Sequence, residues 1–331
     1  MPKATAGAPR LREAGALAML AAVVGAAAIA EPRFLEPQSL NNLLLWLPML
    51  LVAAIGQMLV IVARGVDVSV GSTLGLSAIV AGVAFRASPE LHPFLGFLIA
   101  AVAGLALGSV NGALVVLGRV PPILATLGTL AAFRGLAFIV SKGEQVDSNH
   151  IPAALAGWSQ HGPAQVGGVT LSWALALALA VALVAHVALT RTPAGIHLFA
   201  VGGNEEAARL SGVPVRRVRF GAFALCGLLA GIAGALYMSR FRFVNPATAG
   251  QGFELTVIAA AVIGGANILG GSGTVLGVLL GCALLASINV ALAVLGIAAT
   301  WQLAAYGAAI LAALLLEGAW KSRAARKDSP R

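Results

Sequence analysis

The chain has 331 residues, of which 59% are hydrophobic and only 10% are charged. A soluble domain carries about a quarter charged residues, so this composition excludes a soluble globular protein and indicates a polytopic membrane protein. The net charge of +9 does not indicate a nucleic-acid binder, because the basic residues are scattered between hydrophobic runs and form no patch interleaved with aromatic side chains. Cys226 and Cys282 lie inside apolar runs and are expected to be packing residues, without a disulfide or a metal site.

Ten hydrophobic segments are expected to cross the membrane as helices, each near the ~20 residues that a bilayer requires. In chain order they are 14–30, 41–63, 70–86, 94–117, 121–140, 171–190, 220–240, 253–271, 274–295 and 299–317. The expected fold is therefore an all-α polytopic membrane protein with a single transmembrane domain over 1–331.

Four of these segments allow more than one interpretation. Segment 70–86 is short and contains Gly71 and Gly75, so among the ten it is the first candidate for a broken or re-entrant segment, with a continuous span as the open alternative. Segments 253–271 and 274–295 are separated only by Gly-Gly-Ser-Gly at 270–273. The first segment ends in Ala-Ile-Ala at 28–30, which resembles a signal-peptidase site, so a cleaved leader is an open alternative there.

Basic residues predict the orientation, since cytoplasmic loops are enriched in Lys and Arg. With the N-terminus inside, fifteen basic residues fall on the cytoplasmic side: Lys3, Arg10, Arg12, Arg64, Arg119, Arg191, Arg209, Arg216, Arg217, Arg219, Lys321, Arg323, Arg326, Lys327 and Arg331. Five fall outside: Arg33, Arg86, Lys142, Arg240 and Arg242. The tails 1–13 and 318–331 and the loop 191–219 are therefore expected in the cytosol. The longest external segment, 141–170, contains His150 and His161 without metal-ligand spacing and is expected to be a solvated loop.

The loop 191–219 contains the most polar stretch between two hydrophobic segments. Asn204 is expected to cap a short helix, with Glu205 and Glu206 in the first turn at the positive end of the helix dipole. Gly212 and Pro214 are expected to end this helix. A docking element for a cytosolic partner and an ordinary positive-inside loop both fit these residues.

Glycines indicate where helices approach closely in lipid. Two triplets at every fourth position belong to the fourth and ninth segments and are expected to pack helices: Gly104, Gly108, Gly112, Gly273, Gly277 and Gly281. These two segments run in opposite directions, which suits an inverted repeat of segments 2–5 and 7–10. Plain glycine-rich packing is the alternative.

No motif of a hydrolase, a metal site or a nucleotide-binding loop occurs in the chain. Arg134 is the only charged residue well inside a segment, whereas proton- and ion-driven transporters usually keep ionisable groups at mid-membrane. The energy for any transport is therefore expected to come from elsewhere. Arg134 itself has three open roles: it lines a pathway, binds a neighbouring helix end, or extends toward the outer interface.

Four motifs, in this order, carry a resemblance to a known family. They are Arg-Gly-Val-Asp-Val-Ser-Val-Gly-Ser at 64–72, Ala-Thr-Leu-Gly-Thr-Leu at 125–130 with Arg134 and Gly135, 203–213, and 252–265 followed by 269–274. Nearly end to end, the chain resembles the ribose-type permease subunits of bacterial ABC importers for monosaccharides.

The resemblance implies a bacterial inner-membrane protein whose coupling helix docks on a separate ATPase subunit. The implied coupling residues are Asn204, Glu205, Glu206, Ala207, Ala208, Arg209, Leu210, Ser211 and Gly212. The further implied partners are a second permease subunit, identical or different, and a periplasmic sugar-binding protein. The chain itself is expected to bind no cofactor, because the ATPase subunit binds ATP, and to be no enzyme on its own.

A pathway or structural-turn role is expected for Asp67, Ser69, Asn111, Arg134 and Asn267. The chain resembles permeases for ribose, for rhamnose and for autoinducer 2 to the same degree, so the resemblance does not identify the substrate. The alternatives are an ATP-independent facilitator or secondary transporter and a permease for branched-chain amino acids.

Overall fold

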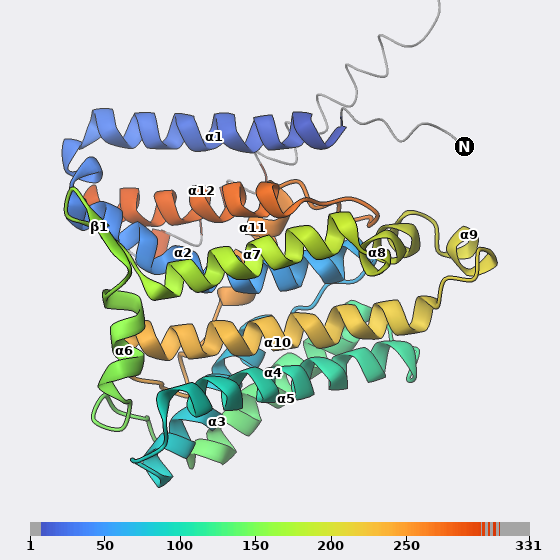
Figure 1. The fold of residues 1–331 in the computed structure, drawn as a ribbon, viewed down its shortest axis with the longest axis horizontal. Coiled ribbons are helices and arrows are strands. Elements are labelled where there is room, and N and C mark those ends of the chain that lie inside the picture. The colour runs from blue at the N-terminus through green and yellow to red at the C-terminus, as the bar shows by residue number, and fades with distance from the viewer. Residues whose placement is uncertain (1–7, 299, 302–303, 305–306, 309–310, 312–331) are drawn as a thin grey trace, which may run out of the picture.

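The computed structural model describes residues 8–298, 300–301, 304, 307–308 and 311, and confirms an all-α polytopic membrane protein (Figure 1). Within these residues, eight helices are long and apolar enough to cross a bilayer. They are α1 (Ala8–Ala30), α2 (Pro37–Val62), α3 (Val70–Ala87), α4 (Pro93–Val116), α5 (Pro122–Ser141), α7 (Trp173–Arg191), α10 (Val215–Phe241) and α12 (Val275–Val294). Residues 1–7, the expected tail 318–331 and most of the expected tenth segment lie outside the described residues, whereas 8–13 of the expected N-terminal tail belong to α1.

Shorter elements mark the two ends of the bundle. At one end, here called the α6 end, lie α6 (Ala153–Gln160) and a hairpin of β1 (Ala164–Val166) and β2 (Val169–Leu171), with Gln165 paired to Thr170. At the opposite end, the α9 end, lie α8 (Pro193–Gly203) and α9 (Glu205–Leu210) (Figure 1). A 3-10 turn, η1 (Pro32–Leu35), joins α1 to α2.

Segment 141–170 is more ordered than the expected solvated loop. It contains α6, whose Leu155 and Ala156 are buried, and Ser239 of α10 donates a hydrogen bond to the Leu155 carbonyl at 2.7 Å. His161 is exposed and His150 is half-buried.

The expected break in 70–86 is wrong, since α3 is continuous over 18 residues. The break falls in 253–271, which was expected to span the membrane. There α11 (Phe253–Ile263) has only 11 residues and covers about 16 Å, roughly half of a bilayer core. Gly265, Gly270 and Gly271 all have positive φ, so the apolar sequence after Ile263 continues as irregular backbone.

Glycines bring α4 and α10 into backbone contact. A Cβ at Gly104 would collide with the carbonyl oxygen of Gly227, and a Cβ at Gly108 with that of Phe223. Gly112, the third glycine of this triplet, lies against Phe220. Close approach of helix backbones supplies the packing that the hydrophobic effect does not supply in lipid.

The second glycine triplet packs a different kind of helix pair. Gly277 and Gly281 of α12 contact α11, at Gly264 and Ala260, whereas Gly273 precedes α12 and lies against Met58 and Val62. The two triplets therefore do not contact equivalent neighbours, and the inverted repeat stays a prediction.

Candidate functional site

The helix α9 projects from the bundle as a short capped unit. The Asn204 Oδ1 accepts a hydrogen bond from the Ala207 N–H at 3.0 Å, and Glu205 and Glu206 occupy the first turn. Gly212, with φ of 80°, directly follows the helix. Ala208 is 4% exposed and faces the bundle, whereas Leu210 is 82% exposed. Leu210 is thus the large apolar side chain that α9 leaves uncovered in the single chain.

Arg64 ties the base of this unit to the core of the bundle. Its Nε donates to the carbonyl of Gly202 and its guanidinium NH2 to the carbonyl of Gly203, both at 2.7 Å. Arg64 itself has φ of 64°, a conformation uncommon outside glycine. The last carbonyls of α8 are thus capped by a cation from the loop between α2 and α3, where the helix dipole favours positive charge.

The loop after α11 also contacts the loops that follow α2 and α8. The Gly271 N–H donates to the Val62 carbonyl at 2.9 Å, and a Cβ at Gly202 would overlap that carbonyl. A Cβ at Gly270 would collide with the Arg64 side chain. The loops after α2, α8 and α11 therefore meet at one point through backbone groups that leave no room for side chains.

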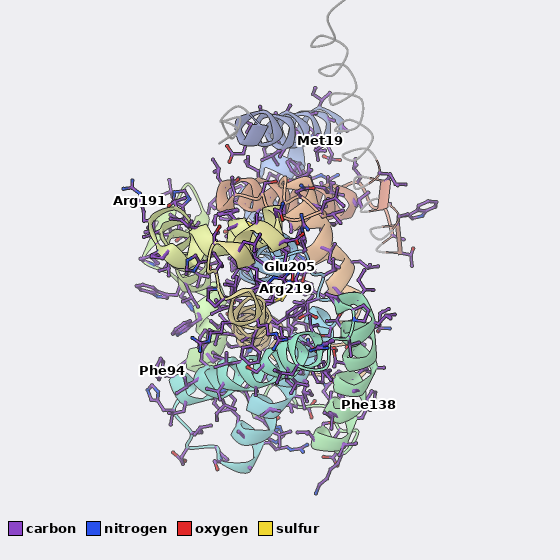
Figure 2. All side chains as sticks on the ribbon, turned by 90° about the vertical axis from the view of Figure 1, so that its right-hand side faces the viewer. Met19, Phe94, Phe138, Arg191, Glu205 and Arg219 are labelled. Carbon is purple, nitrogen blue, oxygen red and sulfur yellow. The ribbon has the colours of Figure 1, made fainter. Side chains whose placement is uncertain are left out.

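An ion pair joins α9 to α10. The Arg219 guanidinium donates to both carboxylate oxygens of Glu205, at 3.2 and 2.7 Å. Figure 2 looks onto the α9 end and shows this pair near the centre, with Arg191 at the edge. The Glu205 side chain is 44% exposed, so the pair contributes orientation more than stability.

A cavity of about 350 Å³ opens beside this ion pair. Its charged lining consists of four arginines and Glu205, and apolar residues from the end of α4 and the start of α5 complete it: Val115, Val116, Val120, Pro121 and Pro122, with Val215 of α10. The four arginines are Arg64, Arg119, Arg216 and Arg219. The lining of this cavity beside α9 therefore carries an excess of positive charge.

Three of the five residues expected to line a pathway or form a turn come together in the core. The Asp67 Oδ1 accepts from the Ser69 N–H and hydroxyl at 2.8 and 2.6 Å, and the Asn111 Nδ2 donates to the Asp67 Oδ2 at 3.2 Å. Thr129 donates to the Asn111 Oδ1 at 2.7 Å. Asp67, Ser69 and Asn111 are at most 1% exposed.

The α2 and α5 helices complete this polar core. The Gln57 side-chain amide is placed in the orientation that satisfies both of its polar atoms. Its nitrogen then donates to the Asp67 carbonyl at 3.1 Å, and its oxygen accepts from the Asp67 N–H at 3.2 Å. Thr126 accepts from the Val68 N–H at 3.1 Å and donates to the Val66 carbonyl. The loop between α2 and α3 is therefore held by α2, α4 and α5, and buried groups satisfied in this way specify one loop geometry.

The remaining two residues of that set lie elsewhere. Asn267 stays within its own loop, where its Nδ2 donates to the Gly270 carbonyl at 3.0 Å. Arg134 is half-buried on α5, and its NH1 donates to the Ala249 carbonyl at 2.7 Å.

Two features of the site could not be read from the sequence. Arg64 stands in the most specific motif, but its partners lie 138 and 139 positions away. The ion pair of Arg219 with Glu205 has no signal in the sequence either, because Arg219 belongs to a run of basic residues that is equally typical of an ordinary positive-inside loop.

Comparison with known proteins supplies the family context. Residues 39–314 match the family described as branched-chain amino acid transport system / permease component. The chain is 37% identical, over 93% of its length and 87% of the relative, to the autoinducer 2 import system permease protein LsrC of Enterobacter sp. (strain 638). It is 34% identical to the ribose import permease protein RbsC of Escherichia coli (strain K12), over 93% of this chain and 94% of that one. The corresponding protein of Bacillus subtilis (strain 168) is 36% identical over 87% of each chain.

Proposed function

Since this chain belongs to the family described as branched-chain amino acid transport system / permease component, we propose that it is the membrane subunit of an ATP-driven importer for a sugar or sugar-like solute. The observation that carries the proposal is α9, an exposed helix whose base is bonded to the core by Arg64 and by the Glu205–Arg219 pair. The resemblance to ribose-type permeases agrees with relatives named for ribose and autoinducer 2 import. The chain has no enzymatic activity of its own in this proposal, and a partner ATPase binds the ATP.

The α9 end is the cytoplasmic end in this proposal. The basic residues that lie there include Arg64, Arg119, Arg191 and those of α9 and the start of α10, whereas Arg33, Arg86 and Lys142 belong to the opposite end. Such an excess is typical of the side that stays in the cytosol. A bacterial inner membrane, a periplasmic binding protein at the α6 end and a second permease subunit complete the assembly.

Two contacts transmit movement from the ATPase to the membrane helices. A shift of α9 is passed by Glu205 to α10 through Arg219, and a shift of α8 is passed to the loop between α2 and α3 through Arg64. Because that loop is fixed to α2, α4 and α5 by the Asp67 core, these helices move as a unit. Rocking of packed helix groups is an established way to open a cavity alternately to two sides.

A sugar or sugar-like solute is favoured over a branched-chain amino acid because the relatives above are named for ribose and autoinducer 2. An ATP-independent facilitator is not favoured, since those relatives are named as permease proteins of import systems.

Uptake by proteoliposomes that contain the chain with its ATPase and binding protein tests the proposal. Radiolabelled ribose, rhamnose and an autoinducer 2 mimic are compared, with the wild-type chain and with Glu206→Lys plus Arg209→Glu. We expect uptake that requires ATP and is lost in the double variant. Uptake that persists without ATP or partners would overturn the importer and favour the facilitator.

A further inference from the structure

Irregular backbone lies deep in the bundle between α10 and α11. A Cβ at Gly75 of α3 would collide with the Ala249 carbonyl, and a Cβ at Gly71 with the Gly250 carbonyl. Gly75 precedes the end of α3 at Ala87 by about 18 Å at the helical rise of 1.5 Å per residue. The segment 242–252 therefore runs from the α6 end past the midpoint of α3 before α11 begins.

Two charged side chains lie along this segment. Arg134, about 10 Å from the end of α5 at Ser141, donates to the Ala249 carbonyl and forms no ion pair within the described part of the chain. Glu254, in the first turn of α11, lies against Gly71. Its buried Oε2 has no hydrogen-bond partner among the described residues. Both residues are half-buried, and Gln251 between them in the loop is exposed.

This strip of Arg134, Gln251 and Glu254 is incompatible with a lipid-facing surface. Charged residues within the membrane face the bundle interior or a water-filled cavity, because hydrocarbon cannot solvate them. Irregular backbone at membrane depth is likewise tolerated only where protein or water covers it. Gln251 is exposed in the single chain and Arg134 and Glu254 are half-buried, so the open side of the strip must face water, polar solute or protein in the assembly.

We propose that the strip lines a water-filled path and binds the solute, which on the function proposed above is a neutral polyhydroxy compound. The guanidinium supplies donors, the carboxylate supplies acceptors and the Gln251 amide supplies both, so hydroxyl groups of either orientation are bound. One positive and one negative charge together give no preference for an ion of either sign. The Asp67 core takes no part, because its groups are buried and bonded to one another.

Cysteine labelling tests water access independently of transport. Cys226 and Cys282 are fully buried, so the wild-type chain gives a low background with a charged, hydrophilic thiol reagent. Gln251→Cys is compared in lipid nanodiscs with Leu183→Cys, which lies in the middle of α7 and is 64% exposed.

We expect Gln251→Cys to react at least about ten-fold faster, because the charged reagent is excluded from hydrocarbon around Leu183. Excess transported sugar should slow the reaction. Equal rates for the two variants would overturn the water-filled path, whether the strip is covered by lipid or by dry contact with a second copy. This result requires neither ATP nor partner proteins, so it is distinguishable from failure of the proposed function.

Solute binding is tested by uptake with Glu254→Gln, in the full complex, for several sugars. We expect the half-saturating concentration to rise about ten-fold, as for loss of one charged hydrogen bond, and the ranking of sugars to change. Leu183→Ala is the control and should leave the half-saturating concentration and the ranking of sugars unchanged. A purely structural Glu254 would lower all rates equally without changing the ranking, and this result would overturn the binding role.

Discussion

Arg64 and Gly202 lie 138 positions apart in the chain, and the Arg64 side chain donates a hydrogen bond of 2.7 Å to the Gly202 carbonyl. A second bond of equal length reaches Gly203, directly before the Asn204 cap of α9. Arg64 and Asp67 stand in the same short loop, separated only by Gly65 and Val66, so this contact joins the end of α8, directly before α9, to the buried polar core.

Replacement of Arg64 by lysine should uncouple transport from ATP hydrolysis. A lysine cannot reach two carbonyls with a planar fork, so one of two charged hydrogen bonds is lost. We expect ATP-driven uptake to fall about ten-fold while ATPase activity persists. Arg217→Lys, at an exposed arginine of the same end that does not line the cavity, should retain wild-type uptake. An unchanged ratio of uptake to hydrolysis in Arg64→Lys would contradict the transmission route.

Exchange of the two residues of the Glu205–Arg219 pair should restore the coupled uptake that each single substitution reduces. Glu205→Arg and Arg219→Glu each place like charges 2.7–3.2 Å apart and should reduce coupled uptake. The double variant re-forms the pair with opposite polarity, and we expect recovery of at least part of the activity. Because the pair is partly exposed, its stability contribution is about 1 kcal/mol or less, so thermal unfolding should change little. A double variant that is no better than the singles would indicate that Glu205 acts on another partner.

The α9 helix shows what local sequence can predict. Asn204, Gly212 and Pro214 mark its boundaries through capping and backbone preference, which act within a few residues, and the structure places α9 at 205–210. Segment 253–271 shows the limit of hydropathy. Its residues are largely apolar on both sides of Gly264, but the chain leaves the helix at this residue, where α12 approaches through Gly277. Contacts such as Arg64 with Gly202 depend on the packed fold and have no local signal.

The backbone contact between α4 and α10 should be sensitive to a single methyl group. Gly104→Ala places a Cβ against the Gly227 carbonyl, so the helices must separate. We expect a loss of about 1–3 kcal/mol, as for other overpacked interiors, seen as a lower unfolding midpoint in detergent. Gly221→Ala on α10, where nothing lies within 4 Å of the added Cβ, is the control. It should leave the midpoint unchanged or raise it, because alanine favours the helix.

Removal of Asn111 should destabilise the chain through groups that lose their partners. Asn111→Leu has similar size but leaves Asp67, Ser69 and Thr129 each without one hydrogen bond in a dry interior. The Asp67 Oδ2 then loses its amide donor, whereas Ser69 and Thr129 keep bonds to Asp67 and to the Thr126 carbonyl, so we expect a loss of about 1–3 kcal/mol, seen as a lower unfolding midpoint. Ser109→Ala, at a half-buried position of the same helix where the hydroxyl donates to the Leu105 carbonyl of that helix, should behave as wild type. A stable Asn111→Leu chain would show that the polar core is dispensable for folding.

Leu210 should carry much of the contact with the ATPase subunit. It is 82% exposed at the end of α9, and Ala208 is the residue of this helix that packs against the bundle. Leu210→Asp therefore has no packing to lose within the chain, and its unfolding midpoint should match the wild type. A buried apolar anchor at a protein interface contributes about 2 kcal/mol or more, so we expect the aspartate variant to lose co-purification with the ATPase. Leu210→Met keeps an apolar side chain of similar volume and should retain the complex. If Leu210→Asp binds the ATPase as tightly as the wild type, another part of the α9 end forms the contact, and the basic cavity beside Glu205 becomes the next surface to alter.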